Sequence, residues 1–332
     1  MSGQHNSLTV IEGMDIPEDL PQASVLRLLP KDADEEYYRN RTDRNWGWIT
    51  RNEQAMLQDA VVGIAGCGGM GGLLLPAFLR AGVGEVRTAD CETFDVSNIN
   101  RQFGAKRRTV GMSKALTTAR DAREVTDDTT VVVYPQGIDE TTVDHFLAGC
   151  DVVLDEIELL TLDARILLHE RGRAEGVPLF NCNTVGFCTN LFLYTPQSMT
   201  MEEAVGFGYE EAKRLRASAG AGDTEAGRMI AEAILGAVVP DLPEYSPETA
   251  EANAAAFYRR IFEEGKAPII ATNPIMAAGF LANRVLLHLL RNSGVRRNIA
   301  HVPPMAGYMQ FDAATMQAKV VSEGWVPRAV RR

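Results

Sequence analysis

The sequence has few features of secreted, zinc-binding or membrane-spanning proteins. Its five cysteines are odd in number and include no CxxC pair, so neither a disulfide framework nor a structural zinc site is expected. The most apolar stretch, residues 275–290, is interrupted by Asn283, Arg284 and His288. It falls short of the roughly 20 apolar residues that a membrane span needs. We therefore expect no zinc and no transmembrane helix.

Positive charge is also scarce. The 33 basic residues are outnumbered by 44 acidic ones, and the formal net charge of −11 disfavours nucleic acid as a partner. The N-terminus lacks the basic start and apolar stretch of a secretory signal, so a cytoplasmic protein is expected. No GxxxxGK[ST] phosphate loop is present, which excludes the usual kinase-like or GTPase-like site.

Apolar runs alternate with helical patterns through the first two thirds of the chain. This rhythm predicts strands at 60–66, 85–90, 130–134, 151–155 and 177–181, and helices at 53–57, 69–81, 112–123, 140–148 and 161–174. Such alternation is typical of right-handed βαβ units in a parallel sheet. We predict an α/β fold with a Rossmann-like, mostly parallel sheet flanked by helices.

Composition divides the chain into four parts. Residues 1–32 show no periodicity and are expected to form a flexible N-terminal arm. Residues 33–195 form the predicted nucleotide domain, and residues 196–268, with helical runs at 201–218 and 249–265, form a helical insertion or lid. In residues 269–332, Asn273 and Pro274 are expected to cap a helix reaching Arg291, and a short β-hairpin follows. That helix is apolar nearly all round, which predicts burial in the core or between subunits.

A glycine-rich turn follows the first apolar strand. In GCGGMG, the glycines Gly66, Gly68, Gly69 and Gly71 allow a sharp strand-to-helix turn. The helix N-terminus then offers amides and a positive dipole end to a phosphate. Asp90 ends the next strand at the spacing where a carboxylate accepts hydrogen bonds from a ribose. These features predict a nucleotide site, and at this point they fit NAD as well as ATP.

The segment after Asp90 carries further polar residues. In SNINRQ, Ser97 and Asn98 can cap a short helix, with Arg101 and Gln102 one turn further along. Lys114 begins the next helix. Taken singly, these residues fit a capped surface turn with solvated charges. Taken together, GxGGxG, Asp90, SNINRQ and VGxxK resemble the ThiF/MoeB family, the bacterial relatives of ubiquitin-activating enzymes that also include HesA.

The resemblance implies an ATP-dependent adenylyltransferase. Asp90 would hold the ribose, Asn98 and Arg101 would contact the phosphates, and Lys114 would neutralise them. The glycine turn and Gln102 would complete the ATP site. The substrate would be a carboxylate, from a peptide or ubiquitin-like carrier-protein C-terminus or from a small metabolite. It would become an acyl-adenylate that a nitrogen or sulfur nucleophile then attacks.

The resemblance also implies a magnesium site after the fourth strand. The family pattern there is LDxxDN, whereas this chain reads LDEIEL, which puts Glu158 at the metal position. A glutamate is a hard oxygen ligand suited to Mg²⁺. Leu159 replaces the neighbouring asparagine, and Asp163 stands where the family has an arginine. Glu158 as a simple polar residue at a strand end stays an alternative.

Family members form homodimers in which an N-terminal arginine reaches the partner's ATP. In RTDRNWGWIT, Arg44 is the best candidate, with Arg41 and Arg51 as rivals. Stacking of Arg44 on Trp46 or Trp48 is the structural alternative. Cys182 and Cys188 lie in apolar sequence and are expected in the core, so direct attack on the adenylate is favoured over an enzyme thioester.

Two other functions stay open on the sequence. The glycine turn and Asp90 alone would suit an NAD-dependent oxidoreductase, although SNINRQ and Lys114 argue against it. The departures at Leu159 and Asp163 would suit a non-catalytic nucleotide-binding subunit of a heterodimer. The sequence names neither the carboxylate nor its acceptor.

Overall fold

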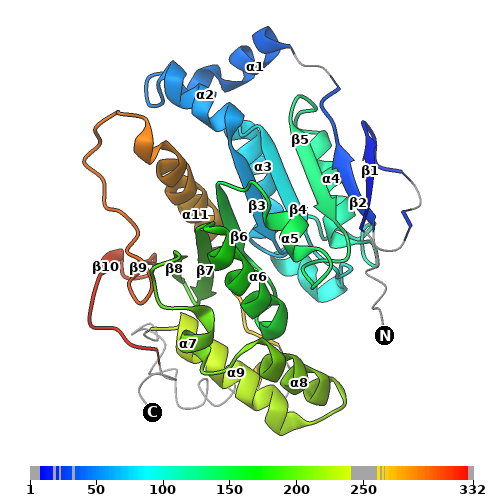
Figure 1. Ribbon diagram of the computed structural model, residues 1–332, viewed down its shortest axis with the longest axis vertical. Helices are drawn as coiled ribbons and strands as arrows, with labels where there is room; N and C mark the ends of the chain where they lie inside the picture. Colours follow the sequence, from blue (N-terminus) through cyan, green and yellow to red (C-terminus); the bar gives the residue numbers. More distant parts are fainter. Residues whose placement is uncertain are drawn as a thin grey trace. The chain divides into compact units, whose positions relative to one another are not determined.

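The computed structural model describes residues 8–17, 20–21, 24–31, 34–240, 260–261, 264 and 266–327, drawn as a ribbon in Figure 1. The chain forms two compact units. The first comprises Met1–Glu156 with Ala278–Arg297, and the second comprises Ile157–Ala277 with Asn298–Arg332. This division differs from the boundaries expected at 32, 195 and 268. In the described part, no helix is long and apolar enough to cross a membrane.

Among its described residues, the first unit holds six strands in the order β1, β2, β5, β4, β3, β6. They are β1 (Thr9–Gly13), β2 (Ser24–Leu28), β3 (Val61–Ala65), β4 (Glu85–Ala89), β5 (Thr130–Tyr134) and β6 (Val152–Asp155). Strands β3 to β6 are parallel, β2 pairs antiparallel with β5, and β1 is parallel to β2. The mostly parallel α/β fold predicted from the sequence is confirmed.

Helices connect these strands. They are α1 (Glu35–Thr42), α2 (Arg51–Asp59), α3 (Gly71–Ala81), α4 (Lys114–Arg123) and α5 (Val143–Leu147). Helices α3 and α4 contact each other and pack on β3, β4 and β5 (Figure 1). Val62, Ile64 and Val131 are fully buried, as expected for parallel strands covered by helices. Because β3 and β4 are parallel neighbours, their carboxyl ends lie at the same end of the sheet. The glycine turn follows β3 and Asp90 follows β4 at this end.

The N-terminal segment is more ordered than the sequence suggested. The expectation of an arm without regular structure missed β1 and β2, which carry the sheet beyond β5. In SVLRL, Val25, Leu26 and Leu28 are fully buried. Strand β2 has only five residues, and its partner β5 lies about a hundred positions further along the chain. The periodicity of so short a segment does not predict this pairing.

The second unit contains antiparallel strands. They are β7 (Leu179–Val185), β8 (Cys188–Tyr194), β9 (Tyr308–Asp312) and β10 (Gln317–Val321). Each pairs antiparallel with the next, so the C-terminal hairpin predicted from the sequence is confirmed as β9 and β10. The sequence predicted only the start of β7 and missed β8. The turn between them at Gly186 and Phe187 is only two residues long and has glycine in the first position, with an apolar residue in the second, so it gives a weak turn signal.

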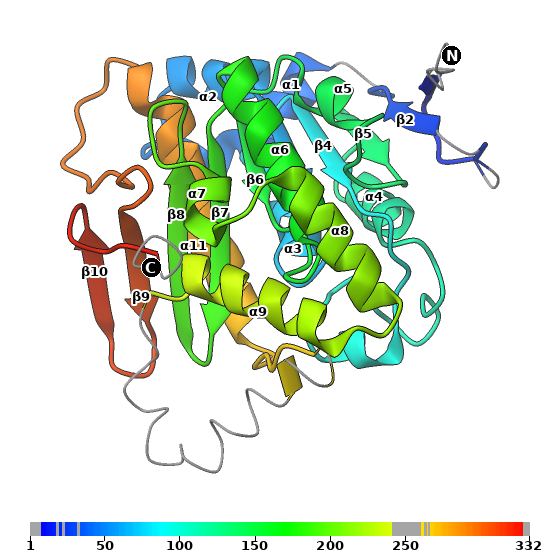
Figure 2. The ribbon, with the colours of Figure 1, turned by 60° about the horizontal axis from the view of Figure 1, so that its bottom comes forward.

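Four helices lie wholly in the described part of this unit, which also contains the first residues of α11 (Asn273–Leu289). They are α6 (Leu162–Glu175), α7 (Met201–Val205), α8 (Tyr209–Gly220) and α9 (Thr224–Val238). Helices α8 and α9 lie side by side (Figure 2) and α8 also contacts α6. The helical run expected at 201–218 is broken, because Gly206 ends α7 in the left-handed conformation. The run expected at 249–265 lies almost wholly outside the described residues.

The predicted C-terminal helix is α11 (Asn273–Leu289), continued by a short 3-10 turn at Leu290–Asn292. Asn273 does not cap it, because its side-chain oxygen accepts no hydrogen bond. The side-chain nitrogen instead donates to the carbonyl oxygens of Gly186 (2.7 Å) and Cys188 (3.0 Å). The helix is also not buried all round, because Ile275 is 46% exposed. The sequence pattern did not distinguish a fully buried helix from one with an uncovered apolar side.

Candidate nucleotide site

The glycine turn joins β3 to α3 in a form that demands glycine. Gly66 has φ of +109°, and its amide donates to the carbonyl oxygen of Ala89 (2.7 Å). A Cβ on Gly71 would lie 1.8 Å from the Gly66 oxygen, so the first turn of α3 packs against the strand end. Within this fully described segment no side chain caps the N-terminus of α3. The Gly72 and Leu73 amides already donate to the carbonyl oxygens of Gly68 (3.2 Å) and Met70 (2.8 Å). The positive end of the helix dipole is therefore what this turn offers to an anion such as phosphate.

Asp90 is tied to this turn. Its Oδ2 accepts from the Cys67 amide (2.7 Å), and its Oδ1 accepts from the Glu92 amide (2.8 Å). Burial raises the pKa of Asp90, and the nearby Lys114 charge works in the opposite direction. Each carboxylate oxygen keeps capacity for a further hydrogen bond. The arrangement suits a ribose with two adjacent hydroxyls.

A 3-10 turn, Val96–Asn100, follows with a cap that differs from the prediction. The cap is Asp95, whose carboxylate accepts from the Ser97 amide (2.7 Å). The Asn98 side-chain oxygen accepts from the Asp95 amide (2.9 Å), which completes a capping box. Ser97 is therefore not the cap. The nitrogen of the Asn98 amide is the group left to donate to a ligand.

Arg101 and Gln102 extend from the end of this turn. Arg101 Nη1 donates to the Asn100 side-chain oxygen (3.1 Å), and in the described part of the chain the guanidinium has no carboxylate partner. Gln102 is 5% exposed, its Oε1 has no hydrogen-bond partner, and its Nε2 would lie 3.7 Å from a Cβ on Gly68. Gln102 thus lies against the glycine turn. The residue before it, Arg101, carries a positive charge that no carboxylate of the described residues neutralises.

Lys114 is the first residue of α4. Its side chain is 6% exposed, and its Nζ lies 2.5 Å from Glu92 Oε2. Glu92 was missed by sequence reasoning, although a second acidic residue two positions after Asp90 was a visible signal. The structure therefore links Asp90, Glu92 and Lys114 by contacts and places Gln102 on the same turn.

The three arginines proposed for the dimer role differ in their surroundings. Arg41 donates to Asp128 (2.6 Å) and to the Leu79 carbonyl oxygen (2.7 Å), so its role is structural. Arg51 stacks over Trp46 at 4.8 Å, the contact considered for Arg44. Arg44 is exposed and makes no hydrogen bond, ion pair or ring contact with the described residues. Among the three, Arg44 is the one available to a ligand or partner.

The ThiF family model matches residues 41–324, which includes every element described above from the end of α1 onward. The chain belongs to the ThiF family.

Individual ThiF-like relatives are more distant. SAMP-activating enzyme E1 of Haloferax volcanii is 32% identical over 126 residues, 38% of this chain and 46% of the relative. The tRNA threonylcarbamoyladenosine dehydratase of Bacillus subtilis is 30% identical over 142 residues, 40% of this chain and 55% of the relative. The matched residues thus span about half the length of these curated relatives. Among solved structures, Escherichia coli MccB with MccA-N7isoASN has a TM-score of 0.57 at 17% identity, covering 89% of this chain and 75% of MccB. That likeness concerns the fold.

Glu158, the predicted magnesium ligand, belongs to the second unit. Glu158 is exposed in the turn before α6, where its carbonyl oxygen accepts from the Thr161 amide (3.0 Å). Asp163, at the family's arginine position, accepts two hydrogen bonds from Arg216 of α8 (3.0 and 3.1 Å). An arginine from elsewhere in the chain therefore lies against Asp163. Among the described residues, no three His, Cys, Asp or Glu side chains cluster as a metal site.

The cysteines of this ThiF chain are mostly buried. Cys182 and Cys188 are each 2% exposed, which confirms their expected place in the core. Cys67 lies in the glycine turn, and burial raises the pKa of its thiol. All five cysteines are in described segments, and none forms a disulfide. Buried thiols with raised pKa are poor nucleophiles.

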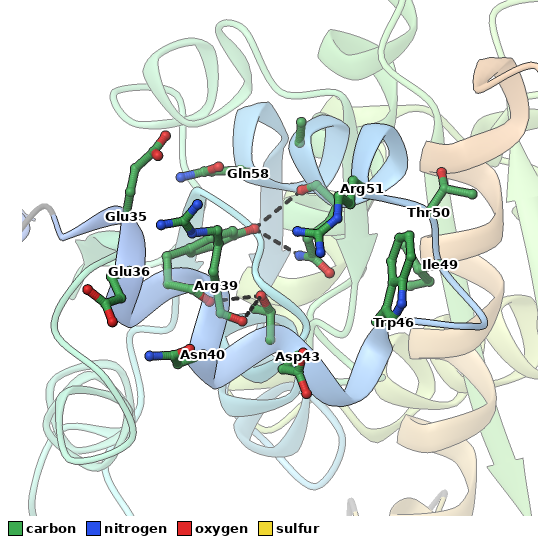
Figure 3. A pocket seen from close by; sticks show the side chains of 14 residues that line it. Glu35, Glu36, Arg39, Asn40, Asp43, Trp46, Ile49, Thr50, Arg51 and Gln58 are labelled. Atoms are coloured by element: carbon green, nitrogen blue, oxygen red, sulfur yellow. Dashed lines mark hydrogen bonds between the residues drawn. The ribbon is translucent and has the colours of Figure 1, made fainter.

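A cavity of about 520 Å³ lies elsewhere in the first unit, between α1 and α2 (Figure 3). Trp46 and Arg51 stand on one side of it, with Glu35, Glu36 and Arg39 along α1. None of the glycine-turn residues lines it. This cavity is therefore separate from the nucleotide site assembled around Asp90.

Proposed function

We propose that this chain is an ATP-dependent adenylyltransferase that activates a carboxylate as an acyl-adenylate. One observation carries the proposal: the uncapped α3 N-terminus, the Asp90 carboxylate and the buried Lys114 ammonium are joined through Cys67 and Glu92. This combination offers a ribose acceptor, the positive end of a helix dipole for phosphate and a fixed cation. Membership of the ThiF family and the name of its archaeal E1 relative support the same reading.

The reaction requires two anions to approach each other. A carboxylate oxygen attacks the α-phosphorus, and the bond from that phosphorus to the pyrophosphate leaving group breaks. Negative charge accumulates on the transferring group, where Arg101 and Lys114 would stabilise it better than water does. Arg101 suits this role because its charge has no carboxylate partner among the described residues.

Magnesium would enter with ATP. Mg²⁺ keeps several waters and takes one or two protein carboxylates together with substrate phosphates, so a ready-made cluster of ligands is not required. Glu158 is exposed and is the proposed protein ligand, on the basis of its place in LDEIEL. When bound, the ion would neutralise phosphate charge.

A homodimer is proposed in which Arg44 serves the partner's ATP. Arg44 is exposed and without a partner among the described residues, whereas Arg41 is engaged with Asp128. Large apolar side chains nearby are also uncovered: Trp46 is 57% and Trp48 87% exposed. Exposed aromatic residues beside arginines are typical of protein interfaces.

The substrate is proposed to be the C-terminus of a peptide or small carrier protein, with a small metabolite carboxylate as the alternative. Helices α7 to α9 are the proposed place of substrate choice, because the nucleotide half is generic. Direct attack on the adenylate by a nitrogen or sulfur nucleophile is favoured, since Cys182 and Cys188 are buried.

Exchange of labelled pyrophosphate into ATP tests the proposal. Purified protein is incubated with ATP, Mg²⁺ and fractions of small carboxylates, peptides and carrier proteins from a cell extract. Carboxylate-dependent exchange is the expected result. Binding of ATP without exchange in any fraction would favour a non-catalytic nucleotide-binding subunit instead.

A further inference from the structure

The buried ammonium of Lys114 already has a carboxylate partner within the chain. Lys114 Nζ lies 2.5 Å from Glu92 Oε2, and the two side chains differ in exposure, 6% against 49%. We propose that Glu92 is a positioning residue, which holds Lys114 in place and competes with nucleotide phosphates for its ammonium. This inference rests on the proposed ATP site and adds a residue that the site motifs do not contain.

The backbone segments that carry Glu92 and Lys114 are held to each other by hydrogen bonds. The Lys114 amide donates to the Glu92 carbonyl oxygen (2.9 Å), and the Phe94 amide donates to that of Met112 (3.0 Å). Thr93 and Ser113 form an antiparallel bridge between these contacts. The two segments are therefore pinned together. A half-exposed glutamate can turn into solvent, whereas Lys114 is confined by burial.

Charge explains why the pair would form and why phosphate would replace it. A buried ammonium without a partner is costly, and Glu92 removes that cost. Glu92 also stands next to Asp90, because its amide donates to Asp90 Oδ1. Two carboxylates then face one ammonium, which disfavours any further anion. A triphosphate must displace Glu92 from Lys114, and return of Glu92 would favour release of pyrophosphate.

The pair predicts an effect that depends on phosphate. Glu92→Gln removes the competing charge and keeps a hydrogen-bonding side chain. We expect the Kd for ATP in calorimetry to fall about threefold to fivefold, the upper end of the range for one partly exposed charge pair. Adenosine, which carries no phosphate, should bind within about twofold of the wild type. The melting temperature without ligand should fall by a few degrees, because Lys114 loses its counter-ion.

A matched control exists on the same helix. Lys106 pairs with Asp121 of α4 at 2.7 Å, with both side chains more than a third exposed. Asp121→Asn removes an equal charge from a lysine outside the proposed site, and the ATP Kd should stay unchanged. Glu92→Asp, which keeps the charge but shortens its reach, should give an ATP Kd between those of Glu92→Gln and the wild type. It also provides the test if the glutamine variant does not fold.

An unchanged or raised ATP Kd in the folded Glu92 variants would overturn the proposal, as would an equal change for adenosine. These outcomes differ from failure of the proposed function. If wild-type protein binds no ATP, the nucleotide site itself is wrong. If it binds ATP without pyrophosphate exchange, adenylation is wrong while competition by Glu92 is still measured.

Discussion

The nucleotide site and the second unit differ in how far apart in the sequence their contacting residues lie. In Gly66–Lys114, the contacts that build the site join neighbouring segments, as between Asp90 and Cys67 or Glu92 and Lys114. In the second unit, Gln310 donates to Asn190 across more than a hundred positions (2.9 Å), and Asn273 reaches the β7–β8 turn. A short motif can therefore contain the residues that bind the nucleotide, whereas the second unit depends on contacts between residues far apart in the sequence. Substitutions in the two regions should therefore have different effects.

The largest effect is expected at Arg101 and Lys114. Arg101→Ala and Lys114→Ala each remove a cation from the transferring phosphate, and pyrophosphate exchange should fall about 10²-fold to 10³-fold. Circular dichroism should show folded protein, because Arg101 has no ion pair among the described residues and Lys114→Ala loses only its pair with the half-exposed Glu92. Pyrophosphate exchange at wild-type rates in both variants would show that Gly66–Lys114 does not contain the catalytic site, and the contrast with the second unit would then be wrong.

The next effect concerns stability in the first unit. Glu53 of α2 is fully buried and paired with Arg297, with Nη2 to Oε2 at 2.8 Å. The Arg297 hydrogen bond lowers the pKa of Glu53 from an ordinary 4.5 to about 2. Its ionised form therefore stabilises the fold fully above pH 4.5, and this contribution is lost as the pH falls through about 2.

Glu53→Gln should accordingly lower the free energy of unfolding by about 3 kcal/mol at neutral pH. Denaturant melts of both proteins across pH check this. The difference should shrink between pH 4.5 and 2. A difference independent of pH would show that lost packing, rather than the ion pair, explains the effect.

Mixed dimers test whether the motif is complete within one subunit. Arg44→Ala and Lys114→Ala proteins should each be impaired alone. Mixed in equal amounts, they should recover about a quarter of wild-type exchange, because half of the dimers are mixed and each has one intact site. Absence of recovery, with subunit exchange verified by mass spectrometry, would place the Arg44 contribution within its own subunit.

The smallest effect is expected at Arg216 in the second unit. Arg216 is 48% exposed and Asp163 is 13% exposed, so Arg216→Ala should cost at most about 1 kcal/mol of stability. The ATP Kd should not change, whereas the KM for the carboxylate should, if this unit selects the substrate. A changed ATP Kd would mean that the two regions do not act separately.

Much of the first unit could be predicted from the sequence. Strands β3, β5 and β6 are short apolar runs, whereas β4 (EVRTA) includes Glu85 and Arg87; each of the four was predicted within one or two residues. Burial on both faces of a parallel sheet produces such apolar runs directly. The glycine turn was equally visible, because Gly66 and Gly71 are positions where a side chain would clash or be strained.

Other features were missed because they depend on partners distant in the chain or on side-chain geometry. β1 and β2 lack a local signature, and β8 was hidden in an apolar run that continues from β7. The cap at Asp95 was assigned to Ser97 and Asn98, since several residues in DVSN can cap a helix. Glu92 was visible as an acidic residue, but its contact with Lys114 required coordinates.

We propose that Gly66–Lys114 binds ATP for adenylation rather than NAD for hydride transfer. The deciding experiment is a calorimetric titration of one wild-type preparation with ATP and then with NAD, repeated on Arg101→Ala. We expect saturable ATP binding that Arg101→Ala weakens at least about tenfold, with no comparable NAD binding. Tight NAD binding without ATP binding would contradict it.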